Sequence, residues 1–583
     1  MEPLANPQST RPAPPPVRED ELLALIATLL SELGSQRALD GLRLDSSLER
    51  DLGLGSLERV ELVSRVGSRF SRALPESTLG VAETVDDLLR LASRAPLMDN
   101  AAPIEAPARR ESVATRIPPL HDAKNLGELL ERRAAAEPER THLFLKEDDR
   151  DEIEVRFQDL YRDSLTVAAG LSSLGVTRSQ TVAIMLPTGY DFFRVFMAIQ
   201  MLGAVPVPLY PPVAVNRLEE YSEKQSAILR NAEAAVFVTL EKGRAIGELL
   251  RSRAPLLRAV VSVGELCQSG VFPRPIAVEP QAPALIQYTS GSTGDPKGVL
   301  LTHRSLLANL RVIGEVLDVQ PDDVGVSWLP LYHDMGLIGA WLMPLYFGIP
   351  VSIFSPLGFL SRPDRWLWTI HTRRATLSAA PNFAYELAAR KVSQESIDAL
   401  DLSCWRAALN GAEPIAPGTM TRFAERFARC GFDARSMMPV YGLAENALLL
   451  AAPPLGRGPR IVRVERGAFE LDSRAVPLGD GASQQASLEF VSAGVPVPAH
   501  ELEVWDEGGE PLPEGCEGRL VFRGPSMMSG YYRNPEATAA VMDRGFIDSG
   551  DRGFLLETRD HYRNIDLSHR RVSPAGSPWE GSP

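Results

Sequence analysis

The amino-acid sequence predicts an all-α bundle near the N-terminus, followed by a large α/β domain of mostly parallel sheets with a small β unit. A chain of 583 residues exceeds what one compact core holds, so at least two domains are expected. Apolar residues recur at helical spacing between residues 22 and 33 and between residues 57 and 66. From about residue 121 to 556, short apolar runs alternate with helix-like stretches, which is typical of parallel sheets joined by helices.

Two stretches rich in proline and alanine divide the chain. Within the bundle, a further helix is expected to begin at Thr84, because Asp87 lies three residues later and completes a capping box. The bundle then holds three or four helices. The expected parts are a disordered lead at 1–18, the helical bundle at 19–92, a linker at 93–120, the α/β domain at 121–556 and an irregular tail at 557–583.

The α/β domain is expected to contain a series of buried strands. Helix-like stretches such as residues 192–202 and 366–372 separate many of them, which favours parallel pairing. The expected strands lie at 182–186, 236–239, 285–289, 351–354, 377–380 and 407–409, and those of the small β unit at 502–505 and 519–523.

Composition and charge exclude several classes of protein. The formal net charge is −14, which argues against nucleic acid or an anionic membrane as the main partner, because both attract clustered lysine and arginine. The four cysteines lie far apart without a CxxC pair, so neither a disulfide framework nor a zinc site is expected. No apolar run approaches the roughly 20 residues of a spanning helix, and no signal peptide is evident. We therefore expect a cytoplasmic protein without a membrane span.

The strongest chemical signal is the segment 288–298 (YTSGSTGDPKG), which directly follows an expected strand. Small residues let backbone N–H groups close around phosphate oxygens, hydroxyl groups add donors, and Lys297 supplies positive charge. The segment is not a Walker loop, because Lys297 follows Pro296 and precedes Gly298. The expected phosphate-binding residues are Thr289, Ser290, Gly291, Ser292, Thr293, Gly294 and Lys297.

Together with this loop, three later segments in a fixed order resemble the adenylate-forming superfamily of acyl-CoA synthetases, luciferases and peptide-synthetase adenylation domains. The first of them, residues 410–414 (NGAEP), is similar to the adenine-binding segment of that superfamily. The resemblance therefore implies that Gly411, Ala412 and Glu413 contact the nucleotide, and that ATP is a cofactor.

The other two segments complete the resemblance. Residues 441–445 (YGLAE) are similar to the motif whose tyrosine, here Tyr441, stacks on adenine and whose glutamate, here Glu445, reaches magnesium. Asp551, within the sequence SGD, matches the aspartate that accepts both ribose hydroxyls. The resemblance thus implies Mg²⁺ as a second cofactor, with Glu445 as its ligand.

Within that superfamily the chain most resembles the fatty acyl-AMP ligases. Residues 328–337 (WLPLYHDMGL) are similar to their signature after the phosphate loop. The resemblance implies that His333 and Lys297 act in catalysis, offsetting negative charge when a carboxylate attacks the α-phosphate. It also implies an insertion between residues 453 and 488 that disfavours transfer to coenzyme A. An amino-acid adenylation domain is less favoured, because residues 377–385 contain no acid to meet a substrate amine.

The helical bundle resembles an acyl carrier domain. Its second helix is expected to begin at Ser56 within LGLGSL, where a carrier keeps the serine that receives phosphopantetheine. A serine there also has a structural explanation as a helix cap, and Gly55 stands where carriers usually have aspartate. The resemblance implies phosphopantetheine as a cofactor, a phosphopantetheinyl transferase as a partner, and a downstream carrier or a polyketide or peptide synthase as another.

The end of the chain departs from the family pattern. Relatives carry a C-terminal lid subdomain with a lysine that bridges carboxylate and phosphate, whereas Lys391 is the last lysine here. We therefore expect the lid to be missing beyond residue 556 and adenylation to be slowed. The predicted function is ATP-dependent activation of a fatty acid to acyl-AMP, for loading onto a phosphopantetheine carrier in lipid, polyketide or lipopeptide biosynthesis. Two alternatives stay open: a carrier fused to an inactive nucleotide-binding remnant, and an acyl-CoA synthetase.

Overall fold

The computed structural model divides the chain into two compact units. One unit comprises Met1–Ala106 with Pro212–Tyr221, and the other comprises Pro107–Pro211 with Ser222–Pro583. The residues that the structure describes are 17–32, 39, 41–48, 51–52, 54, 62–63, 65–67, 69–70, 72, 74, 82, 84–95, 120–146, 151–211, 218–268, 270, 272, 274–289, 297–479, 483–557 and 563–567.

The first unit is helical over much of its described part. Helix α1 (Glu19–Glu32) corresponds to the first predicted helix, and α5 (Val85–Arg94) begins after Thr84 as predicted. Several residues between 62 and 70 are helical as well, whereas Ser56 lies outside the described residues. Apolar side chains from these segments form a small core that includes Leu22, Ile26, Leu29, Leu62, Val66, Val85 and Leu88.

A capping box fixes the start of α5. The hydroxyl of Thr84 accepts a hydrogen bond from the backbone N–H of Asp87 at 3.2 Å. In return, the Asp87 carboxylate accepts one from the backbone N–H of Thr84 at 3.1 Å. Two N–H groups that a helix leaves without partners are thereby satisfied, which confirms the interpretation of this segment as a helix start.

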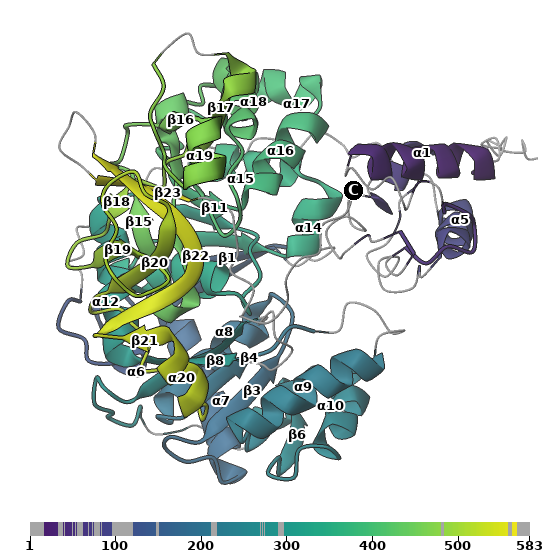
Figure 1. The fold of residues 1–583 in the computed structure, drawn as a ribbon. Coiled ribbons are helices and arrows are strands. Elements are labelled where there is room, and N and C mark those ends of the chain that lie inside the picture. Colours follow the sequence, from purple (N-terminus) through teal and green to yellow (C-terminus); the bar gives the residue numbers. More distant parts are fainter. Residues whose placement is uncertain are drawn as a thin grey trace, which may run out of the picture. The chain divides into compact units, whose positions relative to one another are not determined.

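A parallel sheet of four strands belongs to the second unit. Its strands are β3 (Thr181–Met185), β4 (Val205–Pro208), β5 (Val236–Thr239) and β6 (Ala259–Ser262). The helical segments along this part of the chain are α7 (Phe157–Ser173), α8 (Tyr190–Met201), α9 (Leu218–Ala232), η2 (Glu241–Gly243), α10 (Arg244–Arg251) and α11 (Val263–Leu266). The strand order is β4-β3-β5-β6, and α8 contacts β3 and β4 while α10 contacts β5 and β6 (Figure 1). Every residue of β3 and β5 is buried, which explains why their sequences are nearly unbroken apolar runs.

A sheet of seven strands forms the larger part of the second unit. Its strands are β1 (Thr141–Lys146), β2 (Ile153–Arg156), β9 (Gly325–Ser327), β10 (Val351–Phe354), β11 (Leu377–Ala380), β12 (Ala407–Asn410) and β13 (Met437–Pro439). The order is β13-β12-β11-β9-β10-β1-β2, and every neighbouring pair is parallel except β1 with β2. The predicted parallel α/β architecture is therefore confirmed for this part of the chain.

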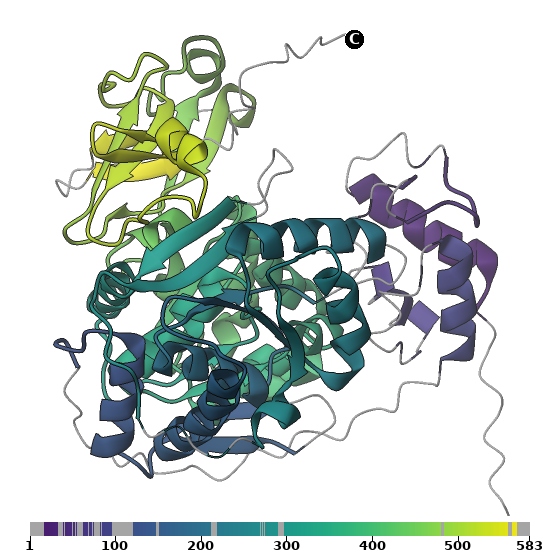
Figure 2. The same ribbon diagram turned by 90° about the horizontal axis from the view of Figure 1, so that it is seen from below.

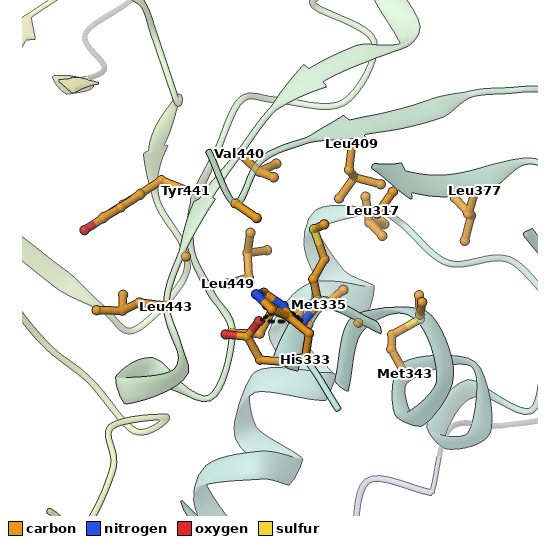
Figure 3. Close-up of a pocket in the computed structure, with 18 of the residues that line it drawn as sticks. Leu317, His333, Met335, Met343, Leu377, Leu409, Val440, Tyr441, Leu443 and Leu449 are labelled. Atoms are coloured by element: carbon orange, nitrogen blue, oxygen red, sulfur yellow. Dashed lines mark hydrogen bonds and ion pairs between the residues drawn. The ribbon is translucent and has the colours of Figure 1, made fainter. Parts of the chain in front are cut away.

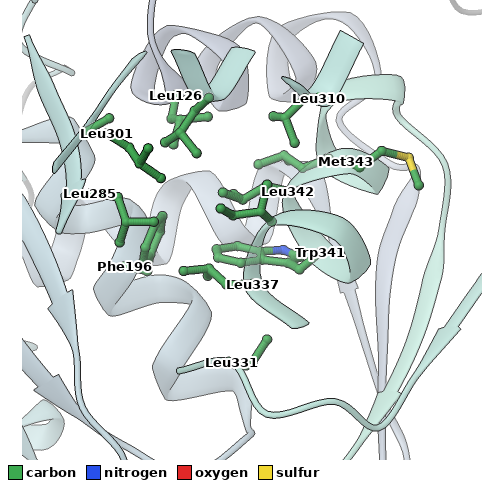
Figure 4. Close-up of a cluster of buried hydrophobic side chains, with 14 of the residues drawn as sticks. Leu126, Phe196, Leu285, Leu301, Leu310, Leu331, Leu337, Trp341, Leu342 and Met343 are labelled. Carbon is green, nitrogen blue, oxygen red and sulfur yellow. The ribbon is translucent and has the colours of Figure 1, made fainter. Parts of the chain in front are cut away.

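Helical segments precede or follow the strands of this sheet along the chain. They are α6 (Leu126–Ala136), α12 (His303–Val316), the π-helical segment η3 (Met335–Leu342), α13 (Met343–Phe347), α14 (Pro356–Ser361), α15 (Asp364–Arg373), α16 (Asn382–Lys391), α17 (Gln394–Ala399), α18 (Pro417–Phe427), η4 (Ala428–Cys430) and η5 (Ala434–Ser436). Within the main core, the Trp341 ring meets Phe193 and Phe196 edge-on, with centroids 4.7 and 5.3 Å away. Leu337 and Leu342 surround the same ring (Figure 4). This packing holds η3 in place, and so fixes the residues that directly precede it.

Short antiparallel pairs complete the middle of the chain. Strands β7 (Pro283–Thr289) and β8 (Lys297–Thr302) pair with each other, and β14 (Tyr441–Gly442), β15 (Leu449–Ala452) and β18 (Val495–Pro496) form a small sheet. The segment between residues 453 and 488, which we expected to be an insertion, includes β16 (Ile461–Glu465), α19 (Arg466–Asp472) and η7 (Gln484–Ala486). Strand β16 pairs with β17 (Ser487–Val491).

The prediction that the C-terminal lid subdomain is missing is wrong. The C-terminal part forms a β half-barrel over about residues 487–556, so a C-terminal subdomain is present. Its elements after β17 include β19 (Glu501–Trp505), β20 (Gly518–Arg523), α20 (Pro535–Val541), β21 (Met542–Asp543), β22 (Phe546–Glu557) and β23 (Arg563–Leu567). The predicted strands at 502–505 and 519–523 are confirmed as β19 and β20, and the yellow strands of Figure 2 gather into one compact group.

The error has a physical reason. We judged the end of the chain by its lysines and its polar composition, whereas strands pair through backbone groups that composition does not reveal. For the same reason the tail 557–583, predicted to be irregular, contains β23, whose residues pair with β22 from Gly553 with Leu567 to Glu557 with Arg563. We expected slowed adenylation because of a missing lid, and this expectation is withdrawn because a C-terminal subdomain is present.

Two further expectations concern the whole described chain. Cys267, Cys404, Cys430 and Cys516 are free thiols, as their spacing predicted. Over the residues that the structure describes, we find no helix with both the length and the apolar character to cross a membrane. The positions of the domain boundaries stay predictions.

Candidate active site

A cavity of about 330 Å³ in the second unit is lined by the strands β9, β11 and β12, the helices α12 and η3, and the segment 440–449. Ala412 and Val440, which line the cavity, follow the carboxyl ends of β12 and β13. The crevice outside the carboxyl ends of parallel strands is where open α/β sheets bind ligands. Figure 3 shows His333 in the middle of this cavity, with Tyr441 on one side and Leu377 on the other.

The two sides of His333 differ in character. On the side of Tyr441, which we call the nucleotide side, the lining residues are those of the predicted nucleotide segments, Ala412, Tyr441 and Glu445. The opposite side, which we call the apolar side, includes Leu317, Met343, Leu377 and Leu409 (Figure 3). The cavity therefore combines a polar region that suits phosphates and a ribose with an apolar region that suits hydrocarbon.

The segment after β12 brings its backbone close to the nucleotide side. A Cβ atom at Gly411 would lie 2.9 Å from the carbonyl oxygen of Val440, so this position excludes larger residues. Ala412 has a φ of +70°, in the left-handed region that non-glycine residues seldom adopt. The Glu413 carboxylate accepts a hydrogen bond from the backbone N–H of Phe383 at 2.6 Å, and burial raises its pKa. Ala412 thus lines the cavity, while Glu413 holds the turn behind it.

Tyr441 and Asp551 meet although 110 residues separate them. The Tyr441 hydroxyl donates a hydrogen bond of 2.9 Å to the Asp551 carboxylate. Burial raises the pKa of Tyr441 well above its ordinary value, and the charge of Asp551 adds to this effect, so the hydroxyl keeps its proton. The predicted adenine and ribose residues are therefore brought into direct contact, in a way that their sequence spacing does not reveal.

Glu445 lies on the short 3-10 segment η6 (Ala444–Asn446) and faces the cavity. Its carboxylate accepts a hydrogen bond of 2.8 Å from the hydroxyl of Tyr531. Burial raises the pKa of Glu445, and the nearby Asp334 charge raises it further. The hydrogen bond from Tyr531 acts in the opposite direction and lowers this pKa. Glu445 is thus a partly buried acid that a bound cation would stabilise in its charged form.

Of the predicted phosphate-binding residues, the structure describes Thr289 and Lys297. They end β7 and begin β8, and they lie opposite each other in the strand register. Ser290, Gly291, Ser292, Thr293 and Gly294 lie outside the described residues. The ammonium of Lys297 lies 5.3 Å from the centre of the Tyr531 ring, a cation–π distance. Thr289 also lines the cavity, together with His333.

His333 and Asp334 form a pair at the start of η3. The Nδ1 atom of His333 lies 2.7 Å from the Asp334 carboxylate, and the His333 side chain is 53% exposed, so a ligand in the cavity can reach it. The same carboxylate accepts a hydrogen bond of 2.7 Å from the backbone N–H of Met335. The Asp334 charge raises the pKa of His333, and the hydrogen bond between the two side chains adds to this effect. Asp334 therefore both orients the imidazole and favours its cationic form.

The acids around the cavity suit a magnesium ion bound mainly through phosphates. Carboxylate oxygen is a ligand that Mg²⁺ prefers, and in phosphate-transfer sites one or two carboxylates usually suffice. The mutual repulsion of Glu445 and Asp334 is the electrostatic situation that a divalent cation relieves. Among the described residues, no group of three or more histidine, cysteine or acidic side chains could hold a metal alone. The donor set therefore fits a metal that arrives with ATP.

A second cavity, of about 240 Å³, meets the first one at Thr289, His333 and Asp334. The side chains of Tyr210 and Tyr332 contribute to its wall. The second cavity thus extends from the groups around His333 to side chains that do not line the first one.

Sequence reasoning missed Tyr531, which contacts two of the predicted site residues. The surrounding sequence contains two adjacent tyrosines, Tyr531 and Tyr532, and no local pattern distinguishes them. The two tyrosines are distinguished by their partners, because Tyr531 is hydrogen-bonded to Glu445 whereas Tyr532 is not. Ser56, in contrast, was predicted from its sequence motif, but it lies outside the described residues.

Comparison with known proteins places the chain. Residues 130–532 match the family described as AMP-binding enzyme, and the chain belongs to this adenylate-forming family. The medium-chain-fatty-acid–acyl-carrier-protein ligase TtuA of Teredinibacter turnerae is 31% identical over 467 residues, which cover 73% of this chain and 71% of that protein. The family match begins at residue 130 and therefore leaves the helical unit unassigned.

Solved structures agree with this placement. A structure from work on the fatty acyl-adenylate ligases of E. coli and L. pneumophila is 34% identical, with a TM-score of 0.71, and covers 76% of this chain and 79% of its own. A fatty acyl-adenylate ligase of L. pneumophila in complex with acyl adenylate and pyrophosphate is 29% identical, with a TM-score of 0.69 and coverage of 76% and 77%. The chain is an acid–AMP ligase of the fatty acyl-AMP ligase kind.

Proposed function

We propose that this enzyme activates a fatty acid as its adenylate and transfers the acyl group to the phosphopantetheine thiol of a carrier protein. The observation that carries the proposal is the apolar side of the cavity, which extends from His333 away from Tyr441. A fatty acid bound there has its chain among leucine and methionine side chains and its carboxylate beside His333. An amino acid would leave its ammonium group among apolar side chains, at a high desolvation cost.

In the first step, a carboxylate oxygen of the fatty acid attacks the α-phosphorus of ATP. A new oxygen–phosphorus bond forms while the bond from the α-phosphorus to the bridging oxygen breaks, and pyrophosphate leaves with that electron pair. Thr289 and Lys297, with residues 290–294 of the loop, hold the phosphates. His333, whose pKa Asp334 raises, supplies positive charge beside the two approaching anions.

The nucleotide side orients ATP for this attack. Tyr441 stacks on adenine against the backbone of Gly411 and Ala412, Glu413 keeps that turn in place, and Asp551 receives the ribose hydroxyls. Glu445 would hold Mg²⁺, which when bound offsets the negative charge of the phosphates. The contact between Tyr441 and Asp551 supports this assignment, because it sets the adenine and ribose positions relative to each other.

In the second step, the acyl group passes to a thiol. The sulfur attacks the carbonyl carbon of the adenylate, a carbon–sulfur bond forms, and AMP leaves with the electron pair of the carbon–oxygen bond while the thiol proton goes to solvent. The second cavity supports this step, because it borders His333 and extends to residues such as Tyr210 and Tyr332 that do not line the first cavity. The similarity to TtuA, an acyl-carrier-protein ligase by name, supports a carrier as the acceptor.

In this proposal, the first acyl acceptor is a carrier domain of the chain itself. Ser56, once modified by a phosphopantetheinyl transferase, receives the acyl group and hands it to a downstream carrier or synthase that makes a lipid, polyketide or lipopeptide. The packed apolar core of α1 and α5, which includes Leu52 and Leu54, supports a folded unit in this part of the chain. Intact-mass measurement after incubation with coenzyme A and a broad-range transferase tests this step. No mass gain, or a gain that persists in Ser56→Ala, contradicts it.

Pyrophosphate release with a panel of acids tests the activity as a whole. Fatty acids should be preferred over amino acids, and acyl transfer to a holo-carrier protein should exceed transfer to coenzyme A. A preference for amino acids would refute the assignment of the apolar side. Efficient formation of acyl-CoA would make the chain an acyl-CoA synthetase, and the absence of turnover with every acid would leave a nucleotide-binding remnant.

A further inference from the structure

Tyr531 joins the two charged residues that we assign to phosphate and metal. Its hydroxyl donates the 2.8 Å hydrogen bond to Glu445, and its ring lies 5.3 Å from the ammonium of Lys297. Tyr531 is only 8% exposed, so both contacts are largely shielded from water. One buried side chain thus contacts an anion with its hydroxyl and a cation with its ring face. The contacts suit a phenol, because its O–H donates a hydrogen bond and its ring face carries a negative potential.

The backbone around Tyr531 is held to both partners. The N–H of Met528 donates a hydrogen bond of 2.8 Å to the carbonyl of Glu445. The N–H of Tyr532 donates one of 2.6 Å to the carbonyl of Gly298, next to Lys297 on β8. The segment 528–532 therefore connects η6 with the end of the phosphate loop, and Tyr531 sits between these two attachments.

The charges themselves suggest what this arrangement achieves. Among the described residues, Lys297 forms no ion pair, yet its charge is close enough to lower the pKa of Glu445. A direct ion pair between the two would have to be broken before a phosphate could reach the lysine or a cation could reach the carboxylate. Tyr531 gives each of them a neutral partner instead, and a neutral partner is easier to leave than an opposite charge.

We infer that Tyr531 is a positioning residue that keeps Lys297 and Glu445 apart and available, the lysine for phosphate and the carboxylate for the divalent metal. This inference rests on the proposed roles of Lys297 and Glu445. It separates two contributions within one side chain: the ring positions the lysine, and the hydroxyl positions the carboxylate. Substitutions can remove these contributions one at a time.

The test uses the full chain and measures the dissociation constant of ATP by calorimetry, without fatty acid. Each protein is titrated once with saturating Mg²⁺ and once in EDTA, so the benefit of the metal is obtained as a ratio. The variants are Tyr531→Phe, which removes only the hydroxyl, and Tyr531→Leu, which also removes the ring. Tyr532→Phe is the matched control, because within the described residues its hydroxyl has no hydrogen-bond partner. Melting temperatures show whether each variant is folded.

Tyr531→Phe should weaken ATP binding about tenfold with Mg²⁺ and leave binding in EDTA unchanged, because only the hydrogen bond to the charged carboxylate is lost. Tyr531→Leu should also weaken binding in EDTA, by about threefold, because the lysine loses its cation–π contact. Tyr532→Phe should match the wild type in both titrations. A purely structural role would instead change the two titrations of Tyr531→Phe by the same factor.

The inference is overturned if folded Tyr531→Phe keeps the wild-type ratio between the two titrations. It is also overturned if Tyr531→Leu binds ATP in EDTA as the wild type does. Lys297→Ala and Glu445→Gln separate this failure from a failure of the proposed function. If they weaken binding, in EDTA and with Mg²⁺ respectively, while the Tyr531 variants do not, only the inference fails. If they bind ATP like the wild type, the roles proposed for Lys297 and Glu445 fail first.

Discussion

The nucleotide side and the apolar side of the cavity are built in different ways. On the nucleotide side, the candidate residues come in short contiguous segments that follow strands β12 and β13 or flank the phosphate loop. On the apolar side, single residues come from separate elements, such as Leu317 after α12, Leu377 on β11 and Leu409 on β12. Groups that bind phosphate must be placed closely together, which a turn achieves, whereas a hydrocarbon chain needs only apolar volume.

This comparison predicts that the two sides fail differently when they are changed, and the largest effect is expected on the nucleotide side. Lys297→Ala should lower the rate of pyrophosphate release by about 10²–10³, because a preorganised charge at the transition state is lost. The order of preference among fatty acids should not change, since the apolar side is intact. Rates with a series of chain lengths check this, and an altered preference would show that the two sides are not independent.

A change on the apolar side should have the opposite character. Leu409→Phe should lower kcat/KM for the longest accepted acids about tenfold, because misfit of a methylene or two costs about 1–3 kcal/mol in a hydrophobic pocket. The shortest accepted acid should keep its wild-type rate, and the KM for ATP should not move. Equal losses for all chain lengths would contradict the placement of the acyl chain beside Leu409.

The link between the adenine and ribose residues should have a smaller effect. Tyr441→Phe removes the hydroxyl that donates to Asp551 and keeps the aromatic ring, so stacking on adenine remains. The KM for ATP should rise about threefold to tenfold, in line with the loss of one hydrogen bond, while kcat with saturating ATP stays near the wild-type value. Initial rates at varied ATP concentration measure both parameters. A fall in kcat without a change in KM would place Tyr441 at the chemical step instead.

The smallest expected effect is a shift in pH dependence at the boundary between the two sides. The Asp334 charge raises the pKa of His333, so the imidazole is cationic below that raised value and the rate should fall as the pH rises through it. Asp334→Asn removes the charge that raises this pKa, so the alkaline limb should move to lower pH. A profile of pyrophosphate release against pH checks the direction. An unchanged alkaline limb would mean that His333 does not act as a cation.

Much of the fold could be predicted because its signals are local. The unbroken apolar runs of β3 and β5 result from burial on both faces, and the capping box of Thr84 and Asp87 lies within four residues. The end of the chain could not be predicted in the same way. Strand β23 belongs to a polar tail and is recognised only by its backbone pairing with β22.

The candidate site divides along the same line. Lys297, Tyr441, Glu445 and Asp551 could be named from the sequence, because each lies in a short motif. The apolar side could not be listed, since leucines of the cavity wall and leucines of the core have the same sequence pattern. Tyr531 could not be chosen over Tyr532 for a similar reason: both are tyrosines in one turn, and their difference is a partner 86 residues away.

The sequence by itself determined the kinds of chemistry that this protein carries, because glycine-rich turns, capping residues and buried strands are set by interactions between near neighbours in the chain. The tertiary structure alone decided which of those residues lie together. It brings Tyr441 to Asp551, and it places Tyr531 between Lys297 and Glu445. These contacts join residues that are far apart in the sequence and depend on how sheets and helices pack together. Such packing produces no periodic pattern in the sequence around the residues concerned.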